Sequence, residues 1–285
     1  MTGRDGRPAA RVWLVTGASR GLGRAVAEAA LDAGERVVAT ARKPGSLDDL
    51  VERHGQRVVP LALDVRHRAD VFATVAEAVE RVGRIDVVLN NAGYGLAGGV
   101  EEVNERQARD QLDVNFFGLL WVTQAVLPVL RRQRSGHLLQ MSSIAGLTSY
   151  PNLGLYCASK WAVEGLSEAL AEEVRGFGVH VTLVEPGEFR TDWSADSMER
   201  AAPMPEYDEV LGRRRHGLSG AYAHLQPGDP ARAGAALLKL LDAERPPLRV
   251  LLGSSAADRA PAVHRERLAE WAAWDALART TDHEG

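Results

Sequence analysis

The chain has 285 residues, of which 45% are hydrophobic and 25% are charged, and its formal net charge is -4. This length is enough for one large α/β domain, and the composition is typical of soluble globular proteins. Such a charge provides no basic field for nucleic acid, so no nucleic-acid partner is expected. The single cysteine, Cys157, excludes an intrachain disulfide and favours a cytoplasmic setting.

The organisation of the chain is predicted from its composition along the sequence. Residues 1–10 are polar, with Gly, Arg and Pro, and we expect a flexible tail there. The apolar run that follows is too short for a signal-peptide core or a membrane span, so no membrane partner is expected. One domain is assigned to 11–255 and a C-terminal helical extension to 256–285. Within the domain, 189–226 has no clear period and contains prolines, which suits a substrate cover.

Seven short apolar runs rich in Val, Leu and Ile have the pattern of parallel strands that are buried on both faces. They are 12–16, 36–40, 58–63, 85–90, 137–142, 179–184 and 248–252. Helical periodicity is found at 21–33, 69–82, 105–130, 155–177 and 229–241. This alternation predicts an α/β fold with a single Rossmann-type domain, in which helices flank a doubly wound sheet of about seven parallel strands. Ligands of such sheets bind at the carboxyl ends of the strands.

A glycine-rich turn directly follows the first predicted strand and precedes a helical pattern. Such a turn lets the backbone approach a pyrophosphate, which then lies at the positive end of the helix. A purely structural turn is the alternative, but the order strand, glycine turn, helix favours a dinucleotide site. The predicted contacts in this turn are Gly17, Ser19, Arg20, Gly21, Leu22 and Gly23.

The spacing Gly-x-x-x-Gly-x-Gly resembles the turn of the compact members of the short-chain dehydrogenase/reductase family. An NAD site usually carries a carboxylate about 20 residues beyond the turn, whereas an arginine there favours the 2′-phosphate of NADP. The second strand ends with Arg42 and Lys43, without a carboxylate, and Arg20 resembles the second basic residue of NADP-preferring members. We therefore expect NADP (NADPH) as the cofactor. Ordinary surface charges at Arg42 and Lys43 are the alternative.

Three further segments resemble cofactor contacts of this family. Asp64 and Val65, after the third strand, match the adenine-contacting position, although Asp64 could instead cap a helix. The run Asn90 to Gly93 follows the fourth strand, and Asn90 is expected to tie the central strands together. From these segments and the turn after the sixth strand, the resemblance implies contacts by Asn91, Ala92, Gly93, Pro186, Gly187, Phe189 and Thr191.

The predicted catalytic residues are Tyr156, Lys160, Ser143 and Asn115. Hydride transfer to a carbonyl leaves negative charge on oxygen, so the site needs a proton donor and a second hydrogen-bond donor. Tyr156 and Lys160 are four residues apart on a predicted helix, where the ammonium can favour phenolate over phenol. Ser143 lies thirteen residues before Tyr156, like the catalytic serine of the family, and would polarise the carbonyl. Asn115 matches the catalytic asparagine, which implies a bound water that links Lys160 to solvent; an amide bonded to nearby backbone is the alternative.

Other classes of site have little support in the sequence. No histidine with a carboxylate partner is placed to activate Ser143, which argues against a hydrolase triad. The eight histidines are scattered and there is one cysteine, so no metal site is expected. The expected substrate pocket is mainly apolar and aromatic, which favours a bulky lipophilic carbonyl compound. Its residues are Tyr94, Leu96, Tyr150, Leu153 and Trp193.

The resemblance covers about two thirds of the chain and implies an NADP(H)-dependent carbonyl reductase or alcohol dehydrogenase that acts on a ketone, aldehyde or alcohol. An NAD-dependent alcohol dehydrogenase and a nucleotide-binding sensor without turnover are the alternatives. Segments 105–130 and 155–177 carry apolar residues on more than one face and resemble the helices of the family's dimer bundle, so a homodimer or homotetramer is expected. A last predicted helix, 264–278, could cover the pocket or a neighbouring subunit.

Overall fold

The computed structural model describes residues 10–191, 193, 197–218 and 223–283. Seven parallel strands form one sheet in the order β3-β2-β1-β4-β6-β7-β9. The strands are β1 (Val12–Thr16), β2 (Arg36–Ala41), β3 (Val58–Ala62), β4 (Val87–Asn90), β6 (Gly136–Met141), β7 (Val179–Pro186) and β9 (Arg249–Leu252). The predicted α/β fold with a doubly wound parallel sheet is therefore confirmed. Most of the predicted tail, 1–10, lies outside the described residues.

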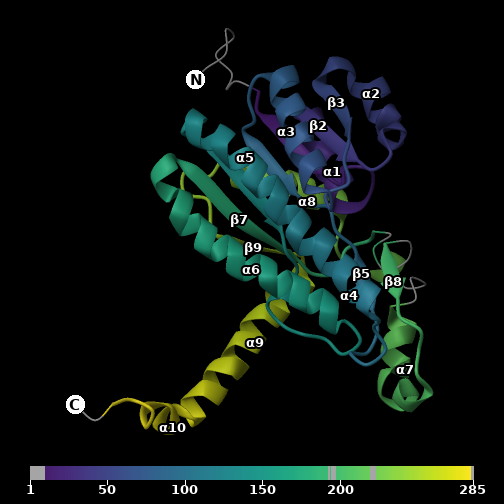
Figure 1. Cartoon of the computed structure of the whole chain (residues 1–285), viewed down its shortest axis with the longest axis vertical. Coiled ribbons are helices and arrows are strands. Elements are labelled where there is room, and N and C mark those ends of the chain that lie inside the picture. The colour runs from purple at the N-terminus through teal and green to yellow at the C-terminus, as the bar shows by residue number, and fades with distance from the viewer. Residues whose placement is uncertain (1–9, 192, 194–196, 219–222, 284–285) are drawn as a thin grey trace.

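Helices cover both faces of the sheet (Figure 1). One layer consists of α1 (Gly21–Asp32), α2 (Asp48–His54) and α8 (Pro230–Leu241), and the opposite layer of α3 (Arg68–Val82), α5 (Leu119–Gln133) and α6 (Gly154–Val174). The sequence pattern did not predict α2, because a helix of seven residues is too short to show a helical period.

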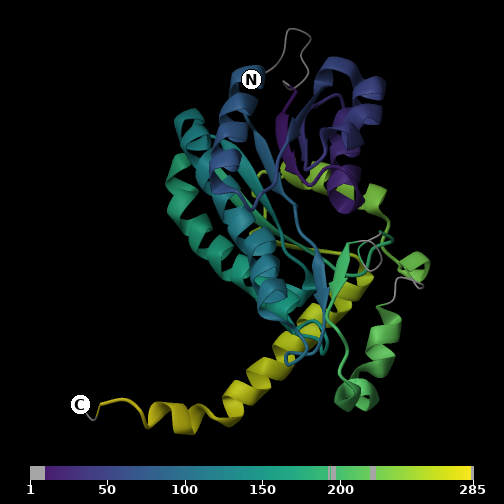
Figure 2. The same ribbon diagram turned by 45° about the vertical axis from the view of Figure 1, so that its right-hand side comes forward.

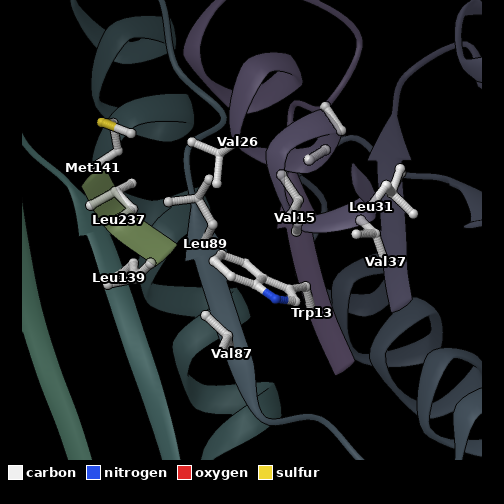
Figure 3. Packing of buried hydrophobic residues seen from close by; sticks show 14 of the residues in the cluster. Trp13, Val15, Val26, Leu31, Val37, Val87, Leu89, Leu139, Met141 and Leu237 are labelled. Carbon is white, nitrogen blue, oxygen red and sulfur yellow. The ribbon is translucent and has the colours of Figure 1, made fainter. Parts of the chain in front are cut away.

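Strand β1 supplies side chains to the hydrophobic cores on both faces because successive residues of a strand point in opposite directions. Trp13 and Val15 pack with the layer of α1 and α8, whereas Val12 and Leu14 pack with the opposite layer. Figure 3 shows Trp13 among side chains from neighbouring strands and from the helices that cover them. This two-sided burial explains why the strands are almost continuously apolar in sequence.

The predicted helix 105–130 consists of three consecutive parts. These are α4 (Glu105–Leu112), a π-helical segment η3 (Asp113–Gly118) and α5. A Cβ atom on Gly118 would lie 2.5 Å from the Val65 side chain, so glycine allows the helix to approach the end of β3 closely. The span Glu105–Gln133 is long and apolar enough to cross a membrane by length and composition alone, as core helices of soluble proteins also are. Here Val122, Val126 and Leu130 of α5 pack on the sheet.

The segment 189–226 is more regular than the sequence predicted. It contains β8 (Met198–Arg200), which pairs in parallel with β5 (Gly95–Ala97), and α7 (Asp208–Gly217). The C-terminal extension forms α9 (Ser254–Ala273) and α10 (Asp275–Arg279). Figures 1 and 2 show α9 leaving the domain and projecting away from it.

A buried histidine in the sheet gives a testable dependence of stability on pH. His137 in β6 has its Nε2 atom 2.8 Å from the Thr182 hydroxyl. Burial, assisted by His180 and Arg11, lowers the pKa of His137 from 6.5 to about 3. The unfolded chain binds this proton at higher pH than the folded chain, so stability is lost as pH falls from about 6.5 towards 3, by up to about 1.4 kcal/mol per unit.

We predict that His137→Gln flattens the loss of stability between pH 7 and 4.5, as measured by urea unfolding at several pH values. Glutamine removes the titrating group and retains a hydrogen bond to Thr182. The exposed His264→Gln serves as the control and should follow the parent chain. Equal slopes for His137→Gln and the parent would contradict the assignment.

Candidate active site

A cavity of about 690 Å³ lies at the carboxyl ends of the central strands. It extends from the glycine turn after β1, past the loops after β4, β6 and β7, to segment 189–226. The sheet order changes direction between β1 and β4, which is where ligands of doubly wound sheets bind.

Most of the predicted site residues line this one cavity. From the catalytic set they are Ser143, Tyr156 and Lys160. The predicted cofactor contacts that line it are Gly17, Ser19, Arg20, Gly21, Leu22, Arg42, Asp64, Val65, Asn91, Ala92, Gly93, Pro186, Gly187, Phe189 and Thr191. From the substrate set they are Tyr94, Tyr150, Leu153 and Trp193. Asn115, Gly23 and Leu96 are not among the described residues that line it.

The glycine turn leaves an open cradle at the start of α1. Gly17 and Gly21 have φ angles of 66° and 61°, a region that L side chains rarely adopt. Nothing lies within 4 Å of where a Cβ atom of Gly21 would be, and no side chain caps α1. The free backbone N–H groups at this end therefore suit a phosphate. A Cβ atom on Gly23 would collide with Asn91 and the Gly17 carbonyl, so this glycine allows close packing, and its contact with the cofactor stays a prediction.

The asparagine pair after β4 fixes the loop against the glycine turn. Asn91 donates through Nδ2 to the carbonyl oxygens of Thr16, at 3.0 Å, and Gly17, at 3.1 Å. Asn90 donates to Gln140 Oε1 at 2.8 Å and to the Thr123 hydroxyl at 3.1 Å. Asn90 thus ties β4 to β6 and α5, as predicted.

Two arginines line the part of the cavity formed by the glycine turn and the end of β2. Arg20 and Arg42 are exposed cavity-lining residues, and neither makes an ion pair or a side-chain hydrogen bond within the part of the chain that the structure describes. Asp64 lies nearby and pairs with Arg66 at 2.7 Å, and the Arg66 side chain lowers the pKa of Asp64. The N-cap position of α3 is His67, which makes no side-chain capping hydrogen bond, so Asp64 is not the N-cap residue of this helix.

Tyr156 is buried in the wall of the cavity. Burial raises the pKa of its phenol to about 12, and a hydrogen bond with Ser143 opposes this shift. The Ser143 oxygen accepts from the Ala145 N–H at 3.1 Å, which leaves the hydroxyl proton free to be donated. The acidity that Lys160 and the positive charge of an oxidised cofactor would together give this phenol stays a prediction.

Lys160 shares the helix face of Tyr156, as the spacing predicted. Its ammonium is buried, donates to the Met141 carbonyl at 2.8 Å and lies 5.9 Å from the centroid of the Tyr156 ring. Burial lowers the pKa of Lys160 to about 8, and the carboxylate of Glu164 opposes this shift. The lysine is thus mainly a cation at neutral pH, although it lies in a dry environment.

The side chain of Asn115 is hydrogen-bonded within the protein. Its side chain accepts from the Tyr94 N–H at 3.0 Å and donates to the Tyr94 carbonyl at 3.0 Å and to the Ser159 hydroxyl at 3.1 Å. These contacts use the amide within the protein, which agrees with the alternative of an amide bonded to backbone. Asn115 therefore positions the Tyr94 loop, and the water expected between this residue and Lys160 stays a prediction.

Apolar and aromatic groups form the substrate end of the cavity. The rings of Trp193 and Tyr156 have centroids 5.1 Å apart, and Met198 and Leu153 pack in the same cluster. The prediction that Leu96 lines the pocket is wrong. Successive side chains of β5 point to opposite sides of the strand, and the neighbours Gly95 and Ala97 face Trp193 and this cluster. Leu96 consequently lies on the opposite side of the strand.

Sequence reasoning missed a buried polar cluster behind the catalytic face. Ser142 donates to Glu164, whose other carboxylate oxygen lies 3.2 Å from Arg249 Nε, and Glu185 is 3.5 Å from the same nitrogen. One signal was present in the sequence: Glu164 follows Lys160 by four residues, so both lie on one helix face. No pattern in the local sequence indicated that Arg249 of β9 belongs to this cluster, because its partners Glu164 and Glu185 are distant in sequence.

The comparisons with known proteins agree with this geometry. The family model described as short chain dehydrogenase matches residues 11–202. The chain belongs to the short-chain dehydrogenase/reductase family. Within it, oxidoreductase BOA17 of Botryotinia fuckeliana is 43% identical and matches 88% of this chain and 91% of its own length. The 3-ketodihydrosphingosine reductase of Bacteroides thetaiotaomicron is 36% identical over 85% of this chain and 88% of its own.

Solved structures of short-chain dehydrogenases share the fold. A short-chain dehydrogenase from Streptomyces avermitilis is 41% identical, with a TM-score of 0.91 over 96% of this chain and 99% of that one. A family member from Burkholderia phymatum in complex with NAD is 25% identical, with a TM-score of 0.79 over 92% and 95%. One from Burkholderia cenocepacia in complex with NADP is 28% identical, with a TM-score of 0.73 over 92% and 96%. The protein is therefore an oxidoreductase of this family.

The hydrogen bonds of Asn115 predict a loss of stability on substitution. Asn115→Ala leaves the Tyr94 N–H without its acceptor, which we expect to lower the free energy of unfolding by about 1–3 kcal/mol. Turnover should fall as well, because Tyr94 lines the cavity. Gln111→Ala, which removes another donor to the Tyr94 carbonyl, is the matched variant. Normal stability together with lost turnover would show that the amide acts on the reaction itself.

Proposed function

We propose that the protein is an NADP(H)-dependent carbonyl reductase or alcohol dehydrogenase that acts on a lipophilic ketone or aldehyde and its alcohol. One observation carries the proposal: the protonated phenol of Tyr156 lines the same cavity as Arg20 and Arg42. The phenol can donate a proton to the carbonyl oxygen of a substrate. The two guanidinium groups can bind a phosphate of a nucleotide in the same cavity.

The residues present fit an NADP nucleotide. The open cradle at Gly21 and the uncapped start of α1 would hold the pyrophosphate. Arg20 and Arg42 would hold the 2′-phosphate, for which a planar guanidinium is the better match. Asp64 accepts hydrogen bonds and would hold the adenine amine. When bound, NADPH supplies the hydride.

Tyr156 and Ser143 would act on the carbonyl oxygen. As hydride reaches the carbonyl carbon, the phenol donates its proton to the oxygen while the Ser143 hydroxyl donates a hydrogen bond. The raised pKa of Tyr156 keeps this proton in place at neutral pH, which suits the reducing direction. Oxidation of an alcohol requires the phenolate, which the burial of Tyr156 disfavours. A cation close to the phenol must offset most of that effect.

Lys160 would supply this positive charge and orient the nucleotide. One of its three N–H groups is donated to Met141, so the others remain for the nicotinamide ribose. Its position on the same face of α6 as Tyr156 places the charge beside the phenol.

The lipophilic substrate is inferred from the walls of the cavity. Trp193, Met198 and Leu153 pack in one cluster with Tyr156 and line the cavity. The name of one relative, 3-ketodihydrosphingosine reductase, denotes the reduction of a ketone. Initial rates of loss of NADPH absorbance with steroid, retinoid, aromatic and polyketide-type carbonyl compounds test this proposal. A folded protein that binds NADPH and turns over none of them would favour the sensor alternative.

Coenzyme choice is predicted to depend on Arg42. Arg42→Asp removes a charge-assisted phosphate contact and adds a carboxylate, so NADPH affinity should fall at least tenfold, by about 1.5–3 kcal/mol. The efficiency ratio of NADPH to NADH should fall with it. Lys43→Asp is the matched control, because Lys43 is exposed and lies outside the described cavity lining. An unchanged efficiency ratio of NADPH to NADH in Arg42→Asp would contradict the NADP assignment and favour NAD.

We also propose that the protein is a homodimer or homotetramer through α5 and α6. The rings of Phe117 and Trp121 stack with their centroids 5.7 Å apart. Phe117 and Trp161 are 37% and 38% exposed, and exposed apolar side chains of this size are typical of an interface. Light scattering should show an oligomer at micromolar concentration, and Phe117→Glu with Trp161→Glu should shift it towards monomer. Val210→Glu, on the exposed side of α7, should not. A monomeric parent chain would refute this arrangement.

A further inference from the structure

Two buried glutamates lie behind the catalytic face, and neither is among the described residues that line the cavity. Glu164 is on α6, one turn beyond Lys160, and Glu185 is in β7 directly before Pro186. Both are almost completely buried. The proposed function assigns no role to Glu164 or Glu185.

Within the described residues, a single cation, Arg249, lies within ion-pair distance of both carboxyl groups. Arg249 Nε lies 3.2 Å from Glu164 and 3.5 Å from Glu185. Another nitrogen of the same guanidinium is 2.9 Å from the exposed Glu168. One arginine, itself partly exposed, thus faces three carboxyl groups. Two adjacent carboxylates in a dry site cannot both ionise easily.

The hydrogen bonds indicate where the proton lies. Glu164 accepts from the Ser142 hydroxyl and from Arg249, both of which stabilise a carboxylate. Glu185 has a buried oxygen, Oε1, with no hydrogen-bond partner in the described part of the chain. A carboxylate oxygen can only accept, so a proton between the two acids would satisfy both. Burial raises the pKa of both acids. For Glu164, the Ser142 hydroxyl and Arg249 oppose the rise, whereas for Glu185 the adjacent Glu164 adds to the effect of burial and the pKa is raised to about 8.

We infer that Glu164 and Glu185 share one proton, which resides on Glu185, and that the single charge left on Glu164 holds the buried Lys160 as a cation. Glu164 is then a positioning residue for the catalytic lysine. An ammonium removed from water needs a nearby anion, and the Met141 carbonyl alone supplies only a dipole. The catalytic consequence rests on the proposed function, whereas the charge assignment does not.

The lysine content of the chain makes a direct test possible. The sequence contains only Lys43, Lys160 and Lys239, and the first and last are exposed. Protein labelled with ¹³C at the lysine ε-carbon should give three signals, and the signal of Lys160 is the one missing from Lys160→Met. Titration of the cofactor-free protein then measures the pKa of Lys160, with the two exposed lysines as internal references.

The two acids are predicted to differ in this titration. Glu164→Gln keeps a partner for Ser142 but removes the charge, so the pKa of Lys160 should fall by about one unit, a tenfold loss of proton affinity. Glu185→Gln replaces a group that is already neutral at pH 7. Below pH 8, the Lys160 signal of this variant should therefore follow that of the parent to within about 0.3 pH units. Glu168→Gln is the exposed control and should behave like the parent. An unchanged Lys160 in Glu164→Gln, or equal shifts in both variants, would overturn the inference.

A second measurement does not depend on the folding of Glu164→Gln. Infrared spectra of the parent protein at pH 7 should contain the carbonyl band of a buried, protonated carboxyl group, and Glu185→Gln should lack it. Absence of the band from the parent, or its persistence in Glu185→Gln, would overturn the shared proton.

Activity measurements separate this inference from the proposed function. In Glu164→Gln, the alkaline limb of the pH profile of kcat should move to lower pH by the same shift as the Lys160 titration, while Glu168→Gln keeps the parent profile. A failed titration would overturn the inference and leave the carbonyl reductase proposal intact. Failure to reduce any carbonyl compound would overturn the proposed function and leave the titration result standing.

Discussion

The buried ammonium of Lys160 donates to the Met141 carbonyl at the end of β6 and thereby fixes α6 against that strand end. The contact brings Tyr156, on α6, into the same cavity as Ser143, which follows β6. Burying a charge in this way is unfavourable unless it is hydrogen-bonded and has an opposite charge nearby. The position of Glu164 one turn away meets that need, so the arrangement of the catalytic residues and the polar cluster behind them form one electrostatic unit.

Much of the fold and site could be predicted because the relevant signals are local in sequence. The strands are apolar runs, since both faces of the sheet are covered by helices. The glycine turn at 17–23, the arginine at the end of β2 and the spacing of Tyr156 and Lys160 each occupy a few consecutive residues. Parallel strands place their carboxyl ends at one edge, so these separate motifs meet in a single cavity.

Other properties depend on contacts that local sequence does not contain. Gly23 packs against Asn91 and Asn115 binds the Tyr94 backbone, and both partners are distant in sequence. Leu96 could not be assigned to a side of its strand without the pairing of β5 with β8. The raised pKa of Tyr156 follows from its burial in the folded chain, which the local sequence does not show.

Single-turnover reduction of an accepted carbonyl compound by Tyr156→Phe tests most directly whether Tyr156 delivers the proton. The substitution keeps the ring that packs against Trp193 and removes only the hydroxyl. With saturating NADPH, whose affinity is measured separately and should be almost unchanged, the rate of hydride transfer should fall by about 10²-fold to 10⁴-fold. Near-normal hydride transfer in a folded Tyr156→Phe protein would contradict the account and require a different proton donor.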